Sequence, residues 1–573
     1  MNILGINFNH SDTSACILVN NELIAAVEEE RFNRIKHTNA FPKNSIEYCL
    51  QKANLKLNDV HIIAINTRPL SNVLKKIIFS FKKLISPNLA FRSIKNIKRK
   101  TQIKNEILNN FKDQEFNGKI IYVDHHLSHI ASAYYCSNFN DSICLSIDGF
   151  GDFASLAYGF ASNNEIKIDK KIYFPHSIGI FYQAVTQYLG FNKYGDEYKV
   201  MGLSSYGKPI YKEKLLELIK IKPSCEFQLN LNYFNHFKKD ITMNLNQQFQ
   251  YKNLFNKNFE NLIGFQKRAD NQKVEDFHID LAKSAQQVYE DYLINAIKFL
   301  VEKYKCKNLC LSGGCASNSV ANGKILKKTD IKNLYIPPAP GDAGGAVGAA
   351  YLSSKERIQS HLITASLGPS YSNLEIKNQI DKTIDKEVFK VLFIENNLEL
   401  SKKISDLIIE KKIIGLFYGK MEFGSRALGN RSIIADPRDS NIRDIINAKT
   451  KKRESFRPFA PAILKEEVNN WFEINHDINF MSEVYKFKEE NKHLVPAVCH
   501  VDNTGRLQTV SKENNELYYL IIKEFFKKTN VPIILNTSFN ENEPIVCSPL
   551  DAIQTFLNTK IDTLILENWI IER

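Results

Sequence analysis

One structural unit occurs at two places in this chain of 573 residues. At the N-terminus, apolar segments alternate with short polar turns, which predicts a β-meander with strands at residues 3–8, 14–19 and 23–27. A buried strand is expected again at 143–147, followed by a polar turn at 148–152 and another strand at 154–160. This recurrence indicates an internal duplication.

Two glycine-rich turns follow the second unit. A further apolar strand at 308–311 ends in Ser312-Gly313-Gly314, before a helix expected over 316–327. The turn Pro340-Gly341-Asp342 has the same chemistry and precedes a helix of small residues at 346–351. Glycines at such turns allow backbone amides to approach a phosphate group or an adenosine. Two meander units followed by two such turns resemble the actin-like (ASKHA) ATPase fold of sugar kinases and heat-shock chaperones, whose duplicated halves enclose a nucleotide.

Two histidines and an aspartate lie where they could converge. His125 and His129 are four residues apart in a segment that suits a helix, so both imidazoles are expected on one helical face. Asp148 stands where the strand that begins at 143 is expected to end. Imidazole and carboxylate groups together suit a divalent metal such as iron or zinc. A surface histidine cluster beside a turn aspartate is the alternative that these residues alone leave open.

Composition limits the classes of partner and the compartment. The formal net charge of +13 suits an anionic partner such as a nucleotide, a nucleic acid, a phosphorylated glycan or a membrane surface. The N-terminus has neither a basic region nor an apolar segment of a signal peptide, and no apolar run reaches the roughly 18 residues of a membrane span. We therefore expect a cytoplasmic protein. Its oligomeric state has no signal in the sequence.

Residues 75–104 contain ten Lys or Arg and no acidic residue. An apolar stripe is expected on a helix there, formed by Leu74, Ile77, Ile78, Phe81 and Ile85, with Lys75, Lys76, Lys82 and Lys83 largely off it. One interpretation is a solvated helical excursion from the N-terminal domain. The other is a surface for an anionic acceptor or an anionic membrane.

A change in composition near residues 352–370 marks a domain boundary, because the glycine-rich turns stop there. We predict an N-terminal domain over 1–358 and a C-terminal domain over 359–573. The C-terminal part alternates a helical pattern with short apolar strands, at 398–411, 413–417 and 531–535, so it is expected to be α/β as well.

Motifs along nearly the whole chain, in order, resemble the NodU/CmcH family of O-carbamoyltransferases, which includes the tobramycin and cephamycin carbamoyltransferases. These motifs are HHLSH at 125–129, GDEYKVMGL at 195–203, SGGCASN at 312–318, GDAG at 341–344, MEFGSRALGNRS at 421–432, KKRESFRPFAP at 451–461 and NTSFN at 536–540. The resemblance implies a Kae1-like N-terminal domain and a YrdC-like C-terminal domain, both α/β.

The resemblance also implies a reaction in two steps. In the C-terminal domain, carbamoyl phosphate would lose phosphate, and the resulting carbamate would attack the α-phosphate of ATP to give carbamoyl-adenylate and pyrophosphate. In the N-terminal domain, a hydroxyl of the acceptor would attack the carbamoyl carbon, and AMP would leave. Acceptors in the family include antibiotics, Nod-factor glycans and surface polysaccharides, so the expected acceptor is a sugar, a glycan or a natural product, and not a nucleic acid.

Residues of this sequence match the needs of both steps. For the first step, four cations would bind phosphate groups and two polar side chains would orient the substrate: Arg426, Lys451, Arg453, Arg457, Ser538 and Asn540. For the second step, the resemblance implies nucleotide contacts from Gly313, Gly314, Asn318, Gly341 and Asp342, a metal at His125, His129, Asp148 and Asp342, and a general base at His10. The family suggests iron(II), and ATP would bring Mg²⁺. Any one of the basic residues could instead form a surface ion pair, and His10 could be a polar turn residue.

Two rival functions remain at this level. The first is a tRNA threonylcarbamoyl transferase, which the positive charge favours. The second is a non-catalytic actin-like ATP-binding protein, against which the intact basic and metal positions argue.

Overall fold

The structure is a computed structural model that describes residues 1–69, 71–81, 103–238, 241–243, 249–251, 253–270, 272–356, 359–451, 453–454 and 456–573. The chain divides into two compact units, Met1–Leu362 and Ile363–Arg573. Residues 357 and 358, at the boundary expected from composition, lie outside the described ranges.

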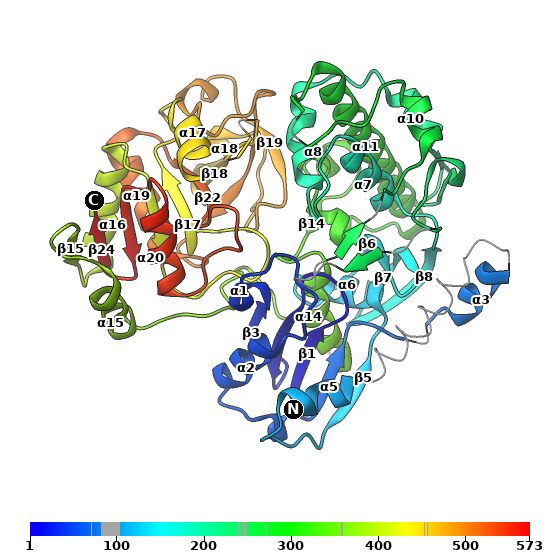
Figure 1. The fold of residues 1–573 in the computed structure, drawn as a ribbon, viewed down its shortest axis with the longest axis horizontal. Helices are drawn as coiled ribbons and strands as arrows, with labels where there is room; N and C mark the ends of the chain where they lie inside the picture. The colour runs from blue at the N-terminus through cyan, green and yellow to red at the C-terminus, as the bar shows by residue number, and fades with distance from the viewer. Residues whose placement is uncertain are drawn as a thin grey trace. The chain divides into compact units, whose positions relative to one another are not determined.

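The first unit contains two five-stranded sheets with the same strand arrangement (Figure 1). In one, the order is β3-β2-β1-β4-β5, formed by β1 (Asn2–Asn7), β2 (Ser14–Val19), β3 (Glu22–Glu28), β4 (Ile62–Ile65) and β5 (Lys119–Tyr122). In the other, the order is β8-β7-β6-β13-β14, formed by β6 (Ser142–Gly151), β7 (Ala154–Ser162), β8 (Glu165–Tyr173), β13 (Asn308–Ser312) and β14 (Asn333–Tyr335). In both sheets three antiparallel strands are followed by two parallel ones. The predicted duplication and the actin-like fold class are confirmed.

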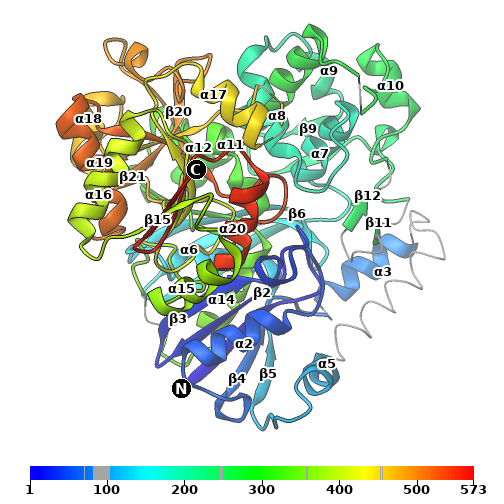
Figure 2. The ribbon, with the colours of Figure 1, turned by 60° about the vertical axis from the view of Figure 1, so that its left-hand side comes forward.

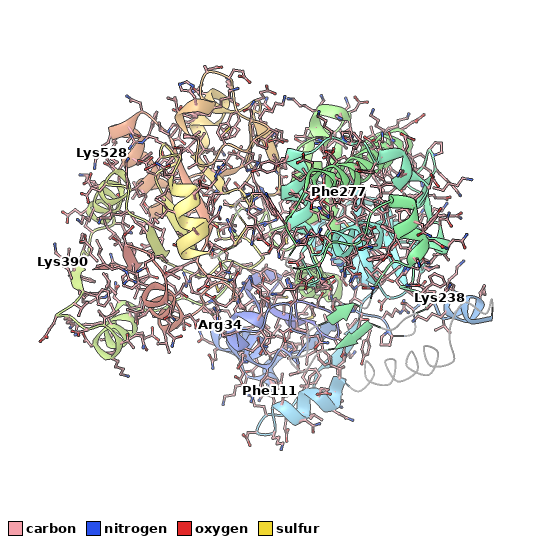
Figure 3. All side chains as sticks on the ribbon, turned by 45° about the horizontal axis from the view of Figure 1, so that its top comes forward. Arg34, Phe111, Lys238, Phe277, Lys390 and Lys528 are labelled. Carbon is pink, nitrogen blue, oxygen red and sulfur yellow. The ribbon has the colours of Figure 1, made fainter. Side chains whose placement is uncertain are left out.

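Two helices link the sheets through a close contact with each other. Helix α14 (Asp342–Ser353) packs on β1 and β2, helix α6 (His125–Tyr134) packs on β6 and β13, and the two helices pack together. Glycines permit this approach, since a Cβ on Gly348 would lie 1.8 Å from the Ser128 carbonyl oxygen. Helix α2 (Lys43–Lys52) covers β2 and β3, and Phe111, labelled in Figure 3, belongs to the core of the first sheet.

The remaining elements of the first unit surround these layers. They are α1 (Glu30–Asn33), η1 (Leu57–Asp59), α3 (Val73–Phe81), α5 (Ile103–Asn110), α7 (Ile178–Tyr188), α8 (Glu197–Leu203), η2 (Ser204–Tyr206), α9 (Lys212–Leu216), β9 (Ile219–Ile221), β10 (Phe227–Leu229), η3 (Leu231–Tyr233), β11 (Ile241–Met243), β12 (Phe249–Tyr251), α10 (Lys257–Ile263), α11 (Asp276–Tyr304), η4 (Gly314–Ser317), α12 (Ser319–Asn322) and α13 (Ile325–Lys328). Most of the basic stretch, including Lys82 and Lys83, lies outside the described residues.

Two local expectations were wrong. Strand β6 continues past Asp148 to Gly151, and the turn is shifted to Asp152 and Phe153, which both have positive φ (49° and 71°), as the two central residues of a tight hairpin turn often do. The helix expected over 316–327 is broken into η4, α12 and α13, because Asn318 caps α12 and Gly323 follows it.

The second unit is α/β, as expected for a YrdC-like domain, and is built around one eight-stranded mixed sheet with the order β15-β24-β23-β16-β17-β22-β18-β21. The strands are β15 (Lys390–Phe393), β16 (Ile414–Phe417), β17 (Arg431–Ala435), β18 (Ala460–Leu464), β21 (Gln508–Val510), β22 (Ile533–Ser538), β23 (Thr563–Leu566) and β24 (Trp569–Glu572). Helices α16 (Asn397–Ile409) and α19 (Glu516–Thr529) pack side by side over a large apolar core (Figure 2).

The smaller elements of the second unit are α15 (Asn373–Thr383), α17 (Ile442–Ile445), η5 (Ile446–Thr450), η6 (Lys465–Glu467), α18 (Val468–Trp471), β19 (Val484–Lys486), η7 (Lys492–Leu494), β20 (Thr504–Arg506) and α20 (Pro549–Asn558). Across the part of the chain that the structure describes, no helix combines the length and apolar character needed to traverse a bilayer.

The contact between α6 and α14 generates a stability prediction. Replacement of Gly348 by Ala should lower the free energy of unfolding by about 1–3 kcal/mol, because the new methyl group meets backbone and the two helices must separate. Gly149→Ala is the matched control, since a Cβ there has nothing within 4 Å. Denaturant unfolding of both variants checks this, and equal stability of the two would contradict a tight helix contact.

Candidate functional site

Helix α6 presents two imidazoles on one face, as the spacing predicted. Its first turn is capped by Asp124, whose side chain accepts a hydrogen bond from the Leu127 amide at 3.2 Å. The Nε2 atoms of His125 and His129 lie 3.0 Å apart, and both side chains are fully buried. The helix therefore directs two nitrogen ligands at a single point.

Two carboxylates from other elements reach the same point. Asp148 comes from β6 and Asp342 is the first residue of α14. Asp148 Oδ2 lies 3.0 Å from His125 Nε2 and 3.6 Å from His129 Nε2. Asp342 Oδ1 lies 3.6 Å from each of these nitrogens. All four predicted metal ligands thus offer an atom within 4.8 Å of the others.

The electrostatics of this cluster fit a divalent cation. Burial raises the pKa of Asp148, but its contacts with His125 and His129 outweigh burial and hold that pKa well below the usual range. Burial lowers the pKa of His129, yet hydrogen bonds to Asp148 and Asp342 raise it to about 9. Asp342 Oδ1 is buried and has no hydrogen-bond partner within the described ranges. Two imidazole nitrogens and two carboxylate oxygens form a donor set that suits iron or zinc.

Glycine-rich turns lie beside Asp148. Gly313 has φ of +86°, and a Cβ there would lie 2.2 Å from the Ile147 carbonyl oxygen. The Gly313 amide donates to the Pro340 carbonyl at 2.7 Å, so the two glycine-rich turns adjoin. A Cβ on Gly149 would meet nothing within 4 Å, and one on Gly341 only the Gly314 Cα at 3.7 Å. The backbone of Gly149 and Gly341 is therefore open where a side chain would begin, as backbone that approaches a phosphate must be.

Asn318, a predicted nucleotide contact, is engaged inside the protein. Its Oδ1 accepts hydrogen bonds from the Ala321 amide (3.1 Å) and from Gln286 Nε2 (3.0 Å), and its Nδ2 donates to Gln286 Oε1 (2.9 Å). The side chain thus caps α12 and joins it to α11, and its sequence neighbours gave no sign of this role.

The other histidines near the cluster differ in position. The ring of His10, the predicted general base, lies 4.7 Å from the ring of His125 and is 9% exposed. His126 hydrogen-bonds Ser146 Oγ through Nδ1 at 2.9 Å and lies outside the four-ligand cluster, so its omission from the predicted ligands agrees with the geometry.

A second group of ionisable residues is an ion-pair cluster. His37 Nδ1 lies 2.7 Å from Asp12 Oδ1, and the His37 amide donates to Glu30 Oε2 at 2.8 Å. Arg31 neutralises Glu30 at 3.0 Å. Burial lowers the pKa of His37, but Asp12 and Glu30 outweigh burial and raise it to about 9. His37 and Arg31 thus pair with the two acids, and Arg31 also lies 3.3 Å from Glu28, so these side chains form a network of ion pairs.

In the second unit, three predicted catalytic residues lie together. Lys451 Nζ, on a side chain that is 1% exposed, donates to the carbonyl and Oδ1 of Asn540 at 2.7 Å each and to the Ser538 carbonyl. Ser538 Oγ donates to Asn540 Oδ1 at 2.8 Å. Ser538 ends β22 and Lys451 follows η5, so residues far apart in sequence form one buried polar cluster.

The predicted arginines gather in the same unit. Glu422 Oε1 accepts from the amides of Leu428 (2.7 Å) and Asn430 (2.8 Å), which folds the loop that carries Arg426. Arg453 Nε donates to Asn447 Oδ1 at 2.7 Å, and its guanidinium lies over the Phe459 ring at 4.7 Å. Arg457 lies 3.6 Å from Glu454. Lys452 and Ser455 of the same motif are outside the described residues.

Arg506 is a member of this arginine group that the sequence analysis missed. Burial lowers its pKa well below the usual value, and the charges of Arg426, Arg453 and Arg457 lower it further. Four guanidinium groups whose charges act on one another are a strong site for an anion. Only the tertiary fold reveals Arg506, since it lies outside every quoted motif, at the end of β20.

The fold and these clusters define the class: an actin-like unit with a centre of histidines and aspartates, joined to an α/β unit with a cationic centre. The family description "Carbamoyltransferase N-terminus" matches residues 2–351 and "Carbamoyltransferase C-terminus" matches residues 405–573. The chain belongs to this carbamoyltransferase family, and the protein is a transferase enzyme. The predicted family resemblance is confirmed, and the non-catalytic alternative is set aside.

Relatives extend over the whole chain. Nodulation protein NolNO of Sinorhizobium fredii is 35% identical over 98% of this chain and 79% of its own length. The uncharacterized protein sll1178 of Synechocystis is 35% identical over 100% of this chain and 96% of its own length. The crystal structure of T. kodakarensis HypF is similar at 13% identity over 61% of this chain and 47% of that one, with a TM-score of 0.31, a likeness that bears on no individual residue here.

The Asp12–His37 pair leads to a prediction about pH. Because folding raises the pKa of His37 to about 9, the pair should stabilise the fold fully below the unfolded histidine pKa of about 6.5 and lose that effect as pH rises through about 9. His37→Gln should therefore lower the melting temperature by more at about pH 6 than at about pH 10. The exposed His61→Gln should show no such trend in the same thermal-shift series. An equal loss at both pH values for His37→Gln would contradict a charged pair.

Proposed function

We propose that the protein is an ATP-dependent O-carbamoyltransferase with the two steps separated between its units. In the C-terminal unit, carbamoyl phosphate loses phosphate to water, and an oxygen of the resulting carbamate attacks the α-phosphorus of ATP. The bond from that phosphorus to pyrophosphate breaks, and carbamoyl-adenylate forms. In the N-terminal unit, an acceptor hydroxyl attacks the carbamoyl carbon, and AMP leaves. The observation that carries this proposal is the group of four arginines in the C-terminal unit, Arg426, Arg453, Arg457 and Arg506, whose charges act on one another.

For the first step, the cations compensate the substrates. Carbamoyl phosphate and ATP bring several negative charges, and Arg426, Arg453, Arg457 and Arg506 supply guanidinium forks that bind phosphate oxygens bidentately. Lys451 holds the loop of Ser538 and Asn540 by its hydrogen bonds, so that their hydroxyl and amide groups can orient the carbamoyl phosphate. Arg506 is an addition to the residues predicted from sequence.

For the second step, His10 would accept the proton of the acceptor hydroxyl, which its place beside the His125 ring supports. The backbone of Gly313, Gly314 and Gly341 would bind the nucleotide part. His125, His129, Asp148 and Asp342 would hold a divalent metal, iron(II) by family resemblance, which when bound would polarise the carbamoyl group or hold the nucleotide phosphates.

The acceptor in this proposal is a hydroxyl of a sugar-containing small molecule, a glycan or a natural product. The family description, together with motifs for both steps in one chain, favours carbamoyl transfer over threonylcarbamoyl transfer to tRNA. An anionic acceptor or membrane surface at 75–104 remains an interpretation of the sequence, since most of that stretch is outside the described residues.

The first step has a direct test in carbamoyl-phosphate-dependent exchange of pyrophosphate into ATP, without any acceptor. Arg457→Ala or Ser538→Ala should abolish this exchange, because each removes a group assigned to substrate binding. Arg438→Ala is the matched control, since Arg438 pairs with Asp436 at 2.6 Å in the same unit. Exchange at the wild-type rate in either test variant would refute the assignment.

The separation of the two steps predicts a second outcome. His129→Ala should lose bound metal, measured by elemental analysis, and should lose acceptor carbamoylation, yet retain pyrophosphate exchange, because all four ligands lie in the N-terminal unit. His126→Gln, next to a ligand but outside the cluster, should keep its metal. Loss of exchange in a folded His129→Ala protein would count against two separate sites.

A further inference from the structure

Ser11, in the loop between β1 and β2, contacts one of the four carboxylate and imidazole ligands. Its Oγ donates a hydrogen bond to Asp342 Oδ2 at 2.8 Å, and the side chain is 3% exposed. A carboxylate can only accept hydrogen bonds, so the single hydroxyl proton of Ser11 is committed to Asp342.

This commitment fixes the direction of a second hydrogen bond. Tyr194 Oη lies 2.5 Å from Ser11 Oγ. Because Ser11 has no second proton to give, the Tyr194 hydroxyl must be the donor. The two hydroxyls therefore form a directed chain, from Tyr194 to Ser11 to the Asp342 carboxylate. Such a chain polarises each member toward the carboxylate.

The two carboxylate oxygens of Asp342 have different contacts. Oδ2 accepts from Ser11, while Oδ1 lies 3.6 Å from both His125 Nε2 and His129 Nε2. Oδ1 is buried and, among the described residues, makes no hydrogen bond. Asp148 is divided in the same way: Oδ1 accepts from the Gly314 amide at 3.1 Å, and Oδ2 lies 3.0 Å from His125 Nε2. Each carboxylate thus turns one oxygen to the centre and has the other held from outside.

Other contacts fix the loop that carries Ser11. Asn7 Nδ2 donates to the carbonyls of Ser11 (2.9 Å) and Asp12 (2.8 Å), and Ser14 Oγ donates to the Ala343 carbonyl at 2.8 Å. The backbone at Ser11 is therefore held to β1 and to the start of α14 without the Ser11 side chain. Loss of the hydroxyl should leave the fold in place.

Separate contacts fix Tyr194, which precedes α8. Its ring meets the His37 ring edge-on, with centroids 5.2 Å apart. The next residue, Gly195, has φ of +84°, and a Cβ there would lie 2.7 Å from His37 Nε2. Removal of the phenolic hydroxyl alone should keep this ring contact.

From this geometry, we propose that Ser11 and Tyr194 are positioning residues that set the affinity of the four-ligand cluster for a divalent metal. Ser11 holds Asp342 directly, and Tyr194 acts only through Ser11. The inference rests on the proposed metal site and adds two residues that no motif assigned to it. Loss of such an outer hydrogen bond to a ligand typically weakens metal binding by about 10-fold to 100-fold.

The test uses the purified full-length protein, stripped of metal and titrated with Co²⁺, with the dissociation constant and the visible Co²⁺ spectrum as readouts. Ser11→Ala should weaken binding by about 10-fold to 100-fold and alter the spectrum, while the melting temperature of the metal-free protein stays unchanged. Ser11→Thr keeps the hydroxyl and should restore both readouts. Tyr194→Phe should weaken binding by a smaller factor, and the exposed Tyr206→Phe should not change it.

The double variant decides whether Tyr194 acts through Ser11. Ser11→Ala with Tyr194→Phe should bind Co²⁺ as Ser11→Ala does, because the outer link has no effect once the inner one is gone. Independent losses that multiply, or unchanged Co²⁺ affinity in Ser11→Ala, would overturn the proposal. If the wild-type protein binds no Co²⁺, the metal site and this inference both fail, whereas pyrophosphate exchange still reports on the first step of the proposed function separately.

Discussion

The contact between α6 and α14 is the constraint on which the N-terminal centre depends. One helix carries both histidines and the other begins with Asp342, so the distance between the helices sets the distance between the ligands. Gly348 of α14 allows the backbones of the two helices to approach, because the Ser128 carbonyl of α6 occupies the space that a side chain at 348 would need. Each helix also packs on a different sheet, so the two duplicated halves of the unit meet at the cluster. Closely packed elements transmit small displacements, so a movement of either half of the unit would change the distances between the four ligands.

Much of the fold could be predicted because its signals are local. Apolar runs bounded by polar turns located β1, β2, β16 and β22 to within a few residues, and four-residue spacing put two imidazoles on one face of α6. The failures have tertiary causes. Strand β6 extends past Asp148 because its pairing with β7, interrupted after Ile147, resumes at Gly151, and such long-range pairing overrides a local turn signal. The helix expected after 316 is broken at Gly323, whose cost in a helix interior competes with the periodic pattern.

The candidate sites divide in the same way. Residues in dense motifs, such as Lys451, Ser538 and Asn540, could be proposed from sequence, and the structure places them in contact. The sequence analysis missed three residues that lie outside the quoted motifs: Arg506, Ser11 and Tyr194. Contacts between residues far apart in the sequence show that they belong to the sites. Asn318 shows a second role: its motif suggested a ligand contact, and its side chain also caps a helix through hydrogen bonds to Gln286 and Ala321. A single sequence does not distinguish a polar residue that binds substrate from one that satisfies the backbone.

The two centres have opposite electrostatic character, and this bears on the proposed division of the reaction. In the N-terminal unit, Asp148 and Asp342 face two imidazoles, a balance that favours a cation at the centre. In the C-terminal unit, desolvation and the charges of three neighbouring arginines depress the pKa of Arg506, so adding an anion there relieves repulsion among like charges. Carbamoyl phosphate and the triphosphate of ATP carry several negative charges, which the two carboxylates would repel and the arginines would attract. Repulsion among the arginines destabilises the group when no ligand is bound, and the same positive charge attracts an anionic ligand. This attraction is the physical reason for the proposed assignment of adenylate formation to the second unit.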